Sequence, residues 1–330
     1  MKADVFNAIV AHLENVNNRQ SNCILLDGKQ LLIDAALFQN SFVQVKNKIA
    51  FVDGGNGEIF AAPNVSVQLV RVYASIFDGR QRVHRSAKEF FVVVAVKENN
   101  GKIVYVTQTF DCSWSLMHEF ELDDKTMSNN NHHVSPAAVA DALRRFAELQ
   151  MAAEIVEQLN DGDVIVRDGE LSARVTHEQQ YYDALFSAAK KKNVSVCGFS
   201  KTTSLLTDVG QSAVVVLSQL NKNAPWYYFP LQSSEIITGF VRLSPHSKYV
   251  FRVDLFNAVH VSNVVSLLLE NSQDPAFLGY PYGLVDADCR AYVSEKERAM
   301  LKLQFFAQFG ERFKAHSAAL DAHDVLNELH

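Results

Sequence analysis

Cysteine, proline and glycine are scarce, with 4, 7 and 14 residues among 330. The cysteines lie far apart and form no C-x-x-C pair, which argues against a zinc ribbon, because such a site needs closely spaced ligands. A disulfide framework is not expected in a chain of this length. We therefore expect reduced thiols and a cytoplasmic protein.

Long apolar runs and strong charge bias are also missing. No segment approaches the roughly 18 apolar residues that a membrane-spanning helix needs, and residues 1–15 lack the pattern of a signal peptide. We expect no membrane contact. The net charge of −6 argues against a surface that binds nucleic acid everywhere, but it allows a local basic groove. The absence of G-x-x-x-x-G-K-[ST] and G-x-G-x-x-G motifs disfavours a nucleotide-binding α/β enzyme.

The order of predicted elements indicates an α/β fold, with a mixed sheet flanked by helices. Runs rich in Val, Ile, Phe and Tyr predict strands at 65–77, 90–96 and 103–110, after a short apolar run at 49–52. Ser135-Pro136 is a strong helix start, and apolar residues then recur every three or four positions to Leu159. A strand follows at 164–166, then helix-like and strand-like segments alternate. Residues 286–313 predict a last long helix that could break near Gly310.

Two Asp-Gly pairs have the same form. Asp53-Gly54 and Asp168-Gly169 each end a short apolar strand. If these strands are parallel neighbours, the two carboxylates lie side by side and need a cation between them. Hard oxygen ligands suit Mn²⁺ or Mg²⁺, and two such ions can stabilise the attacking and leaving oxygens of a phosphodiester. The alternative is that each Asp-Gly is only a turn signal.

The helix between these pairs offers a third carboxylate. Glu148 flanks the apolar face, with Arg144, Arg145, Met151 and Ala152 as its helical neighbours. Glu154 has a more polar setting, so we expect Glu148 to be the functional residue. A solvated surface Glu remains the alternative for both positions.

Several cations are candidates for phosphate contacts. A basic segment surrounds the turn Asp78-Gly79 and contains Arg71, Arg80, Arg82, His84, Arg85 and Lys88. Such a run can follow a phosphate backbone, although solvated turn charges would look the same. Lys201 follows a strand-like run and could meet a scissile phosphate. Arg252 alternates with apolar neighbours, so it faces either solvent or a DNA groove.

Five short motifs, in order, resemble the NurA family of DNA-end-processing nucleases. They are Phe51-Val-Asp53-Gly54, Val166-Arg-Asp168-Gly-Glu-Leu171, Gly198-Phe-Ser-Lys201, Tyr249-Val-Phe-Arg252-Val-Asp254 and Gly279-Tyr-Pro-Tyr-Gly-Leu284. The resemblance implies one domain over 1–330, with a ribonuclease-H-like core at about 45–300, additional strands, and helical extensions at both ends. It also implies a homodimer that cleaves single- and double-stranded DNA in repair or defence, with a hexameric HerA-type ATPase as partner.

The resemblance further assigns residues. It implies Mn²⁺ or Mg²⁺, as two ions, held by Asp53, Glu148, Asp168 and Asp288, with Lys201 as a further catalytic residue. Asp288 stands where relatives commonly carry a His, and Asp286 competes with it for this role. The DNA-binding candidates are Arg82, Arg85, Lys88 and Arg252. The alternative function is an inactive ribonuclease-H-like adaptor of a ring ATPase.

Overall fold

The computed structural model describes residues 2–17, 21–26, 28–127, 133–233, 235–258 and 260–309. The chain forms two units, each made from separate stretches of sequence. Unit 1 comprises residues 1–47, 168–171 and 195–282, and unit 2 comprises 48–167, 172–194 and 283–330. The predicted break near Gly310 lies outside the described residues.

Unit 2 contains a mixed sheet in the order β9-β4-β5-β6-β7-β8. Its strands are β4 (Lys48–Ala62), β5 (Val65–Asp78), β6 (Gln81–Asn99), β7 (Lys102–Phe110), β8 (Glu119–Glu121) and β9 (Val164–Asp168). Strands β4 and β9 are parallel, while β4 to β8 form an antiparallel series. The two strands before Asp-Gly are therefore parallel neighbours, which is the condition under which the two aspartates were expected to lie close together.

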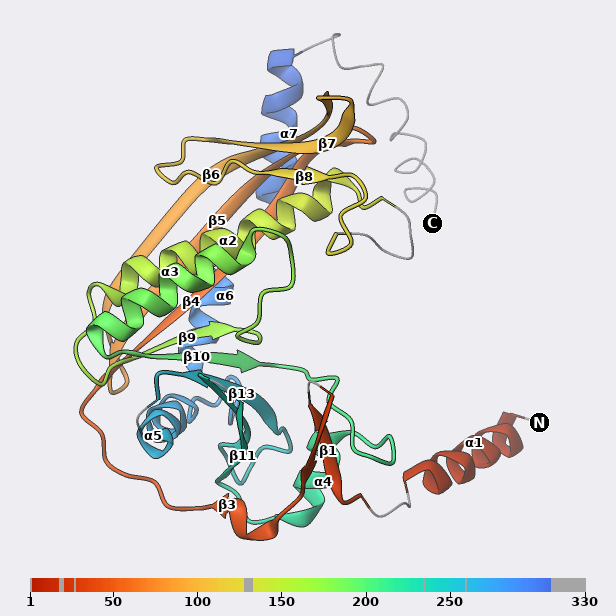
Figure 1. Ribbon diagram of the computed structural model, residues 1–330, viewed down its shortest axis with the longest axis vertical. Helices are drawn as coiled ribbons and strands as arrows, with labels where there is room; N and C mark the ends of the chain where they lie inside the picture. Colours follow the sequence, from red (N-terminus) through yellow and green to blue (C-terminus); the bar gives the residue numbers. More distant parts are fainter. Residues whose placement is uncertain are drawn as a thin grey trace. The chain divides into compact units, whose positions relative to one another are not determined.

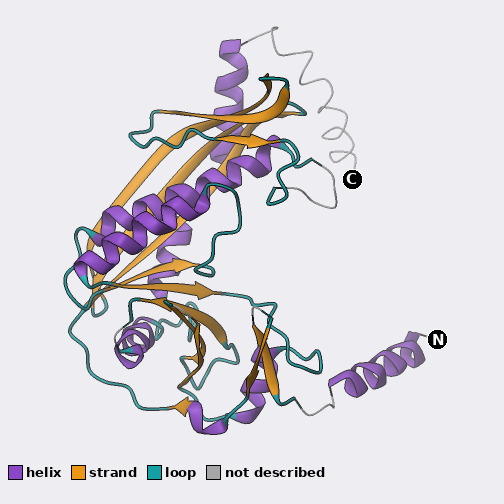
Figure 2. Ribbon diagram, viewed as in Figure 1, coloured by secondary structure: helices purple, strands orange, loops and turns teal. Residues whose placement is uncertain are grey.

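Helices cover both faces of this sheet. On one face lie α2 (Pro136–Val156) and α3 (Glu178–Lys192), and on the other α6 (Tyr282–Ala291) and α7 (Glu295–Phe309) (Figures 1 and 2). The predicted start of α2 is confirmed: the Ser135 side chain accepts a hydrogen bond from the Ala138 N–H, and Pro136 occupies the first turn. The apolar face of α2 is buried, as its spacing predicts.

The prediction that the first strand stops at Asp53-Gly54-Gly55 is wrong. Strand β4 continues through these residues to Ala62, because β5 pairs with it over its whole length. The glycines here allow helices to approach the strand rather than the strand to turn. A Cβ at Gly55 would lie 2.3 Å from the carbonyl oxygen of Ala291, at the end of α6.

Two other predicted elements differ in extent. The single long helix predicted for 286–313 is two helices, α6 and α7, separated by Tyr292, Val293 and Ser294. Strand β6 begins at Gln81 rather than near Phe90, since its polar first half is paired with β5 and needs no apolar pattern. The register shifts between Ile76 and Phe77 of β5, which leaves Val83 of β6 as an extra residue.

Unit 1 is built around an antiparallel sheet in the order β3-β11-β12-β13-β10. These strands are β3 (Phe38–Gln39), β10 (Ser195–Ser200), β11 (Trp226–Ser233), β12 (Ile236–Arg242) and β13 (Phe251–Phe256). A hairpin of β1 (Cys23–Leu26) and β2 (Lys29–Leu32) is separate from it, followed by the short 3-10 helix η1 (Ala35–Leu37). The helices are α1 (Lys2–Asn17), α4 (Ala213–Leu220) and α5 (Val261–Asn271). Trp226, Tyr228 and Phe240 are buried in this unit against α4.

The predicted α/β class, a mixed sheet with flanking helices and additional strands, is confirmed. Among the described residues, no helix is both long and apolar enough to span a bilayer.

Candidate active site

Asp53 lies one residue beyond the parallel pairing of β4 with β9. The register pairs Phe51 with Val166 and Val52 with Arg167, and β9 ends at Asp168. The paired segment therefore stops directly before each of the two aspartates. The prediction that Asp53 lies at a strand end is wrong, because Asp53 lies in the interior of β4. It is buried, and its Oδ1 accepts a hydrogen bond from the Gly54 N–H at 2.8 Å.

The two residues Asp53 and Gly54 face opposite sides of the unit 2 sheet. Asp53 is opposite Tyr73 of β5, and opposed residues of antiparallel strands point to the same face. The hydroxyl of Tyr73 lies 3.5 Å from Oδ2 of Asp286 on α6, so Asp53 is on the α6 face. Gly54 faces α2, where a Cβ would lie 2.8 Å from Oε1 of Glu148. Glycine at 54 thus allows Glu148 to lie directly against β4.

Glu148 is buried and carries two arginine partners. Its Oε2 accepts from Nη2 of Arg167 at 3.1 Å, and its Oε1 accepts from Nη1 of Arg144 on the same helix. Arg144 also donates to the carbonyl oxygen of Gly54 at 3.0 Å. The charge of Glu148, and to a smaller extent that of Asp53, raises the pKa of Arg144 against the opposing effect of burial. Arg144 therefore supplies positive charge to both carboxylates.

Glu154 has a different environment. Its carboxylate accepts from Nε1 of Trp114 at 2.5 Å and forms an ion pair of 2.9 Å with Lys88, whose Nζ lies over the Trp114 ring at 4.1 Å. Its side chain is 40% exposed, against 5% for Glu148. Glu148 is thus the carboxylate of α2 that lies against Gly54, and its role as the functional residue stays a prediction.

Asp168 belongs to unit 1, where the turn 168–171 packs on β10. Its Oδ2 lies 3.2 Å from Nζ of Lys201, and both side chains are partly exposed. The Gly169 N–H donates to the carbonyl oxygen of Phe199 at 3.0 Å. A Cβ at Gly198 would lie 2.5 Å from the Gly169 oxygen, so glycine in β10 permits this close packing.

A buried ion cluster holds the other end of this turn. Arg252 forms ion pairs with Glu170 at 2.8 Å and with Asp254 at 3.1 Å, and its side chain is 11% exposed. Asp254 also accepts from the backbone N–H of Leu171 at 3.1 Å and from the Thr238 hydroxyl at 2.8 Å. Arg252, predicted as a DNA-binding residue, is therefore engaged in positioning the loop that carries Asp168.

The two acidic candidates on α6 differ in exposure. Asp286 is buried and accepts two hydrogen bonds from Nη1 of Arg82, at 2.9 and 2.8 Å. Asp288 is exposed on the same helix. The carboxylate of Asp286 is thus already neutralised by an arginine, whereas Asp288 lies on the accessible side of α6.

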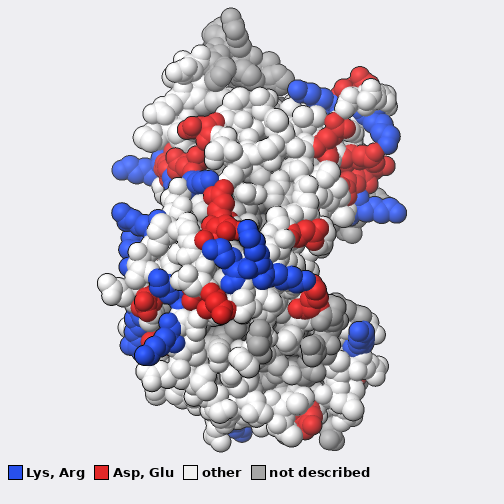
Figure 3. All heavy atoms as spheres, turned by 60° about the vertical axis from the view of Figure 1, so that its left-hand side comes forward, with Lys and Arg blue, Asp and Glu red and all other residues white. Residues whose placement is uncertain are grey.

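The extra residue at Val83 places Arg82 on the same face of the sheet as Arg85, while strand alternation places Lys88 on the other face. Arg82 reaches Asp286 on the α6 face, and Arg85, opposite Ser75, shares that face with Tyr73. Lys88 points instead to Glu154 on α2. On the face drawn in Figure 3, basic and acidic side chains are likewise interspersed. Exposed Arg85 therefore suits a phosphate contact better than Arg82 or Lys88.

Sequence reasoning missed the two arginines that neutralise Glu148. The signal for Arg167 was a charged residue directly after the apolar run 164–166 and before Asp168, since a charge in such a strand needs a buried partner. The signal for Arg144 was its separation of four residues from Glu148 on one helix. Asp254 was part of a motif, but nothing in the sequence indicated that it holds the turn after Asp168.

The carboxylates of unit 2 are oxygen donors of the kind that Mg²⁺ and Mn²⁺ prefer. Asp53 and Glu148 are both buried, but they lie on opposite faces of β4. Within the described ranges, no group of three or more His, Cys, Asp or Glu is arranged to hold a metal ion. Arg144 and Arg167 supply the positive charge beside Glu148.

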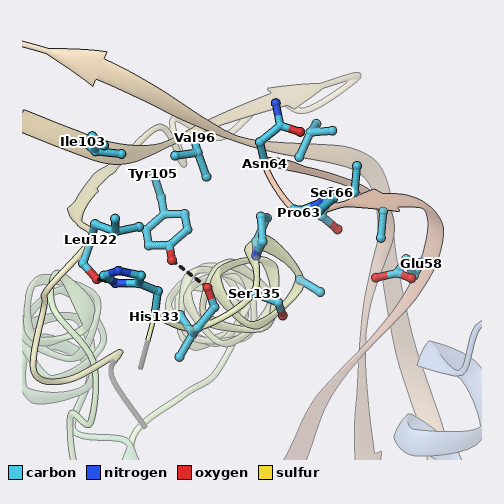
Figure 4. A pocket seen from close by; sticks show the side chains of 16 residues that line it. Glu58, Pro63, Asn64, Ser66, Val96, Ile103, Tyr105, Leu122, His133 and Ser135 are labelled. Carbon is cyan, nitrogen blue, oxygen red and sulfur yellow. Dashed lines mark hydrogen bonds between the residues drawn. The ribbon is translucent and has the colours of Figure 1, made fainter. Parts of the chain in front are cut away.

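A separate pocket of about 660 Å³ lies in unit 2 beside the start of α2. Its lining is largely apolar and includes Val96, Ile103 and Tyr105, whose hydroxyl donates to the carbonyl oxygen of Val134 at 2.6 Å (Figure 4). None of the predicted site residues contributes to this lining. The pocket is therefore distinct from the carboxylate site.

Comparison with known proteins decides the family. The NurA domain pattern matches residues 47–293. The chain belongs to the NurA family. The crystal structure of the NurA nuclease from Sulfolobus solfataricus is similar at a TM-score of 0.54 and 15% identity, covering 95% of both chains. This likeness shows a shared fold, and membership of the family supports a nuclease function.

More distant structures also match. Human endonuclease V gives a TM-score of 0.40 at 12% identity, covering 82% of this chain and 94% of its own. An endonuclease V from Ciona intestinalis, in complex with an inosine-containing DNA, gives 0.41 at 11% identity, covering 79% and 91%. The search of curated proteins finds no match for this chain.

Proposed function

We propose that this NurA-family protein is a metal-dependent deoxyribonuclease that hydrolyses phosphodiester bonds at DNA ends. The observation that carries the proposal is the parallel register of β4 and β9, which stops directly before Asp53 and Asp168 in a chain of this family. In the proposal these two residues, with Glu148 and Asp288, hold one or two Mn²⁺ or Mg²⁺ ions. Bound ions would supply positive charge to the attacking and leaving oxygens.

The protein's own side chains have supporting roles in this proposal. Lys201, which pairs with Asp168, can place an ammonium group next to a phosphate oxygen in the transition state. Arg252 and Asp254 hold the turn 168–171, so that the Asp168 carboxylate keeps one orientation. Arg85 is the exposed cation on the face of β5 and β6 that also carries Tyr73, the residue opposite Asp53, and it contacts the DNA backbone.

The direct test is cleavage of labelled linear DNA, single- and double-stranded, in Mn²⁺, Mg²⁺ or EDTA. We expect cleavage with metal only, and loss of cleavage in Asp53→Asn and Asp168→Asn with an unchanged thermal midpoint. Asp183→Asn removes an exposed carboxylate on α3 and should cleave at the wild-type rate. Cleavage in EDTA, or activity retained in both site variants, would overturn the metal assignment. Mn²⁺ binding without DNA turnover would favour the inactive adaptor instead.

Partnership with a hexameric HerA-type ATPase, and a homodimeric state, belong to the same proposal. The chain has no phosphate-binding motif of its own to drive movement along DNA, so a ring motor would supply that movement. Light scattering should give twice the chain mass. Affinity purification from the native organism should recover a ring ATPase in stoichiometric amount, and recovery of none would contradict the partnership.

A further inference from the structure

The α6 face of the unit 2 sheet carries three arginines around one buried carboxylate. Nη1 of Arg82 donates to both oxygens of Asp286, at 2.9 and 2.8 Å, and Nε of Arg290 lies 3.8 Å from Oδ1 of the same carboxylate. Arg85 lies opposite Ser75 and therefore on this face as well. Strand β6 and helix α6, which are far apart in the sequence, thus bring three guanidinium groups to one side of the sheet.

The hydroxyl of Tyr73 is close enough to all of these charges to be affected by each of them. It lies 3.5 Å from Oδ2 of Asp286 and 3.4 Å from Nη1 of Arg82. Burial raises the pKa of Tyr73, and the charge of Asp286 raises it further. The charges of Arg82, Arg290 and Arg85 all lower this pKa. Three guanidinium groups against one carboxylate leave an excess of positive charge around this hydroxyl.

The three arginines differ in how closely they are bound to Asp286. Arg82 makes both hydrogen bonds, and its side chain is 33% exposed. The side chain of Arg290 is 55% exposed, and its 3.8 Å separation from Asp286 is longer than a hydrogen bond. Arg85 is exposed, and it forms no ion pair within the part of the chain that the structure describes. Arg85 and Arg290 therefore keep hydrogen-bond donors for a ligand.

Two other carboxylates lie on this face or on α6. Asp53 is buried and accepts from the Gly54 N–H, and Asp288 is exposed two residues before Arg290. Both belong to the proposed catalytic set, and both would repel the phosphates of an approaching DNA strand. Exposed arginines beside them offset this repulsion, because the field at a surface depends on the local distribution of charge.

We propose that Arg85 of β6 and Arg290 of α6 each bind a backbone phosphate of the same DNA segment, while Arg82 serves as the counter-ion of Asp286. The proposal rests on the proposed function for the identity of the ligand. It adds Arg290 as a DNA-binding residue, and it assigns the α6 face of unit 2 as the side along which the DNA lies. Guanidinium groups donate two parallel hydrogen bonds to a phosphate, and such contacts bind DNA without selecting its sequence.

The experiment measures the fluorescence anisotropy of a labelled DNA duplex with the full-length protein at several salt concentrations. The buffer contains EDTA, in which the proposed function predicts no cleavage. In Arg290→Gln we expect binding to weaken by about fivefold to tenfold near roughly 0.1 M salt, and the slope of log K against log salt concentration to decrease by about 0.9. Arg85→Gln should behave alike, and the double variant should lose about twice as much slope.

Two further variants serve as controls. Lys191→Gln removes one positive charge from an exposed residue in the last turn of α3, on the opposite face of the sheet, so it should keep the wild-type affinity and slope. Arg290→Lys keeps the charge and should keep a slope near that of the wild type. The thermal midpoints of Arg85→Gln and Arg290→Gln should equal that of the wild type, because both side chains are exposed.

The outcomes separate this proposal from the proposed function. Wild-type affinity and slope in Arg85→Gln or in Arg290→Gln would overturn the pair of phosphate contacts and leave the nuclease function intact. An equal loss in Lys191→Gln would also overturn it, because the loss would then reflect only the net charge of the protein. Weaker binding in both arginine variants, together with a wild type that binds DNA but does not cleave it in Mn²⁺, would support the phosphate contacts and overturn the nuclease function. Absence of DNA binding by the wild type would overturn both.

Discussion

Arg167 and Glu148 form an ion pair of 3.1 Å in which both side chains are almost completely buried, at 4% and 5% exposure. The pair joins β9 to α2 at the point where β9 leaves unit 2. Because each partner is buried, the removal of one leaves a charge without compensation in a medium of low polarity.

We therefore expect Arg167→Ala to lower the free energy of unfolding by about 3 kcal/mol. The double variant Arg167→Met with Glu148→Met should recover most of this loss, since no charge then remains buried. Urea denaturation, monitored by circular dichroism, measures the free energy of unfolding of the single and the double variant. Arg290→Ala, which removes a surface partner of Asp286 at 3.8 Å, should change stability by less than about 1 kcal/mol. Equal losses in all three variants would contradict the special role of the buried pair.

Glu148→Gln and Glu154→Gln should differ in which property they change, DNA cleavage in the first variant and thermal stability in the second. Glu148 lies against Gly54, so its loss as a proposed metal ligand should reduce DNA cleavage and Mn²⁺ affinity by on the order of 100-fold. Glu154 is bonded to Trp114 and Lys88, so its loss should lower the thermal midpoint and leave the cleavage rate of the folded protein near wild type. Loss of cleavage only in Glu154→Gln would refute the choice of Glu148.

Asp288→Asn should reduce the cleavage rate far more than Asp286→Asn. Asp286 is neutralised by Arg82 and contributes to packing, whereas Asp288 is exposed and can accept a metal ion. Asp288→His, which introduces the residue common in relatives, should keep appreciable Mn²⁺-dependent activity. Cleavage by Asp288→Asn at the wild-type rate would show that the fourth ligand lies elsewhere.

Acid should destabilise unit 2 through His118. Burial, and to a smaller extent the charge of His177, lowers the pKa of His118 from 6.5 to about 4 in the folded protein. Between these values the unfolded chain binds a proton that the folded chain does not, so stability decreases as the pH falls from about 6.5 to about 4. In His118→Phe the urea midpoint should depend less on pH across this window. Exposed His84→Gln should keep the wild-type dependence, and an unchanged slope in His118→Phe would contradict the assignment.

Local rules in the sequence determined several elements without tertiary information. Ser135-Pro136 is sufficient to begin α2, because capping and the fixed φ of proline act within one turn. The apolar runs before Asp53 and Asp168 identified β4 and β9 as strands, and such runs are compatible with the parallel pairing that the structure shows. Helical spacing also indicated that Glu148 is closer to the buried face of α2 than Glu154 is, and the two side chains are 5% and 40% exposed.

Only the tertiary structure decided how the charges of the site are arranged. Asp53-Gly54-Gly55 looks like a turn, yet β4 continues through it because β5 pairs along the whole strand and the helices need the space. The partners of Glu148, Asp168 and Asp286 come from other elements, and Arg252 forms ion pairs in the turn after Asp168 that its alternating strand pattern did not indicate. Such ion pairs depend on which side chains the fold brings within a few ångströms of each other, and that depends on registers, bulges and helix packing that no single stretch of sequence contains.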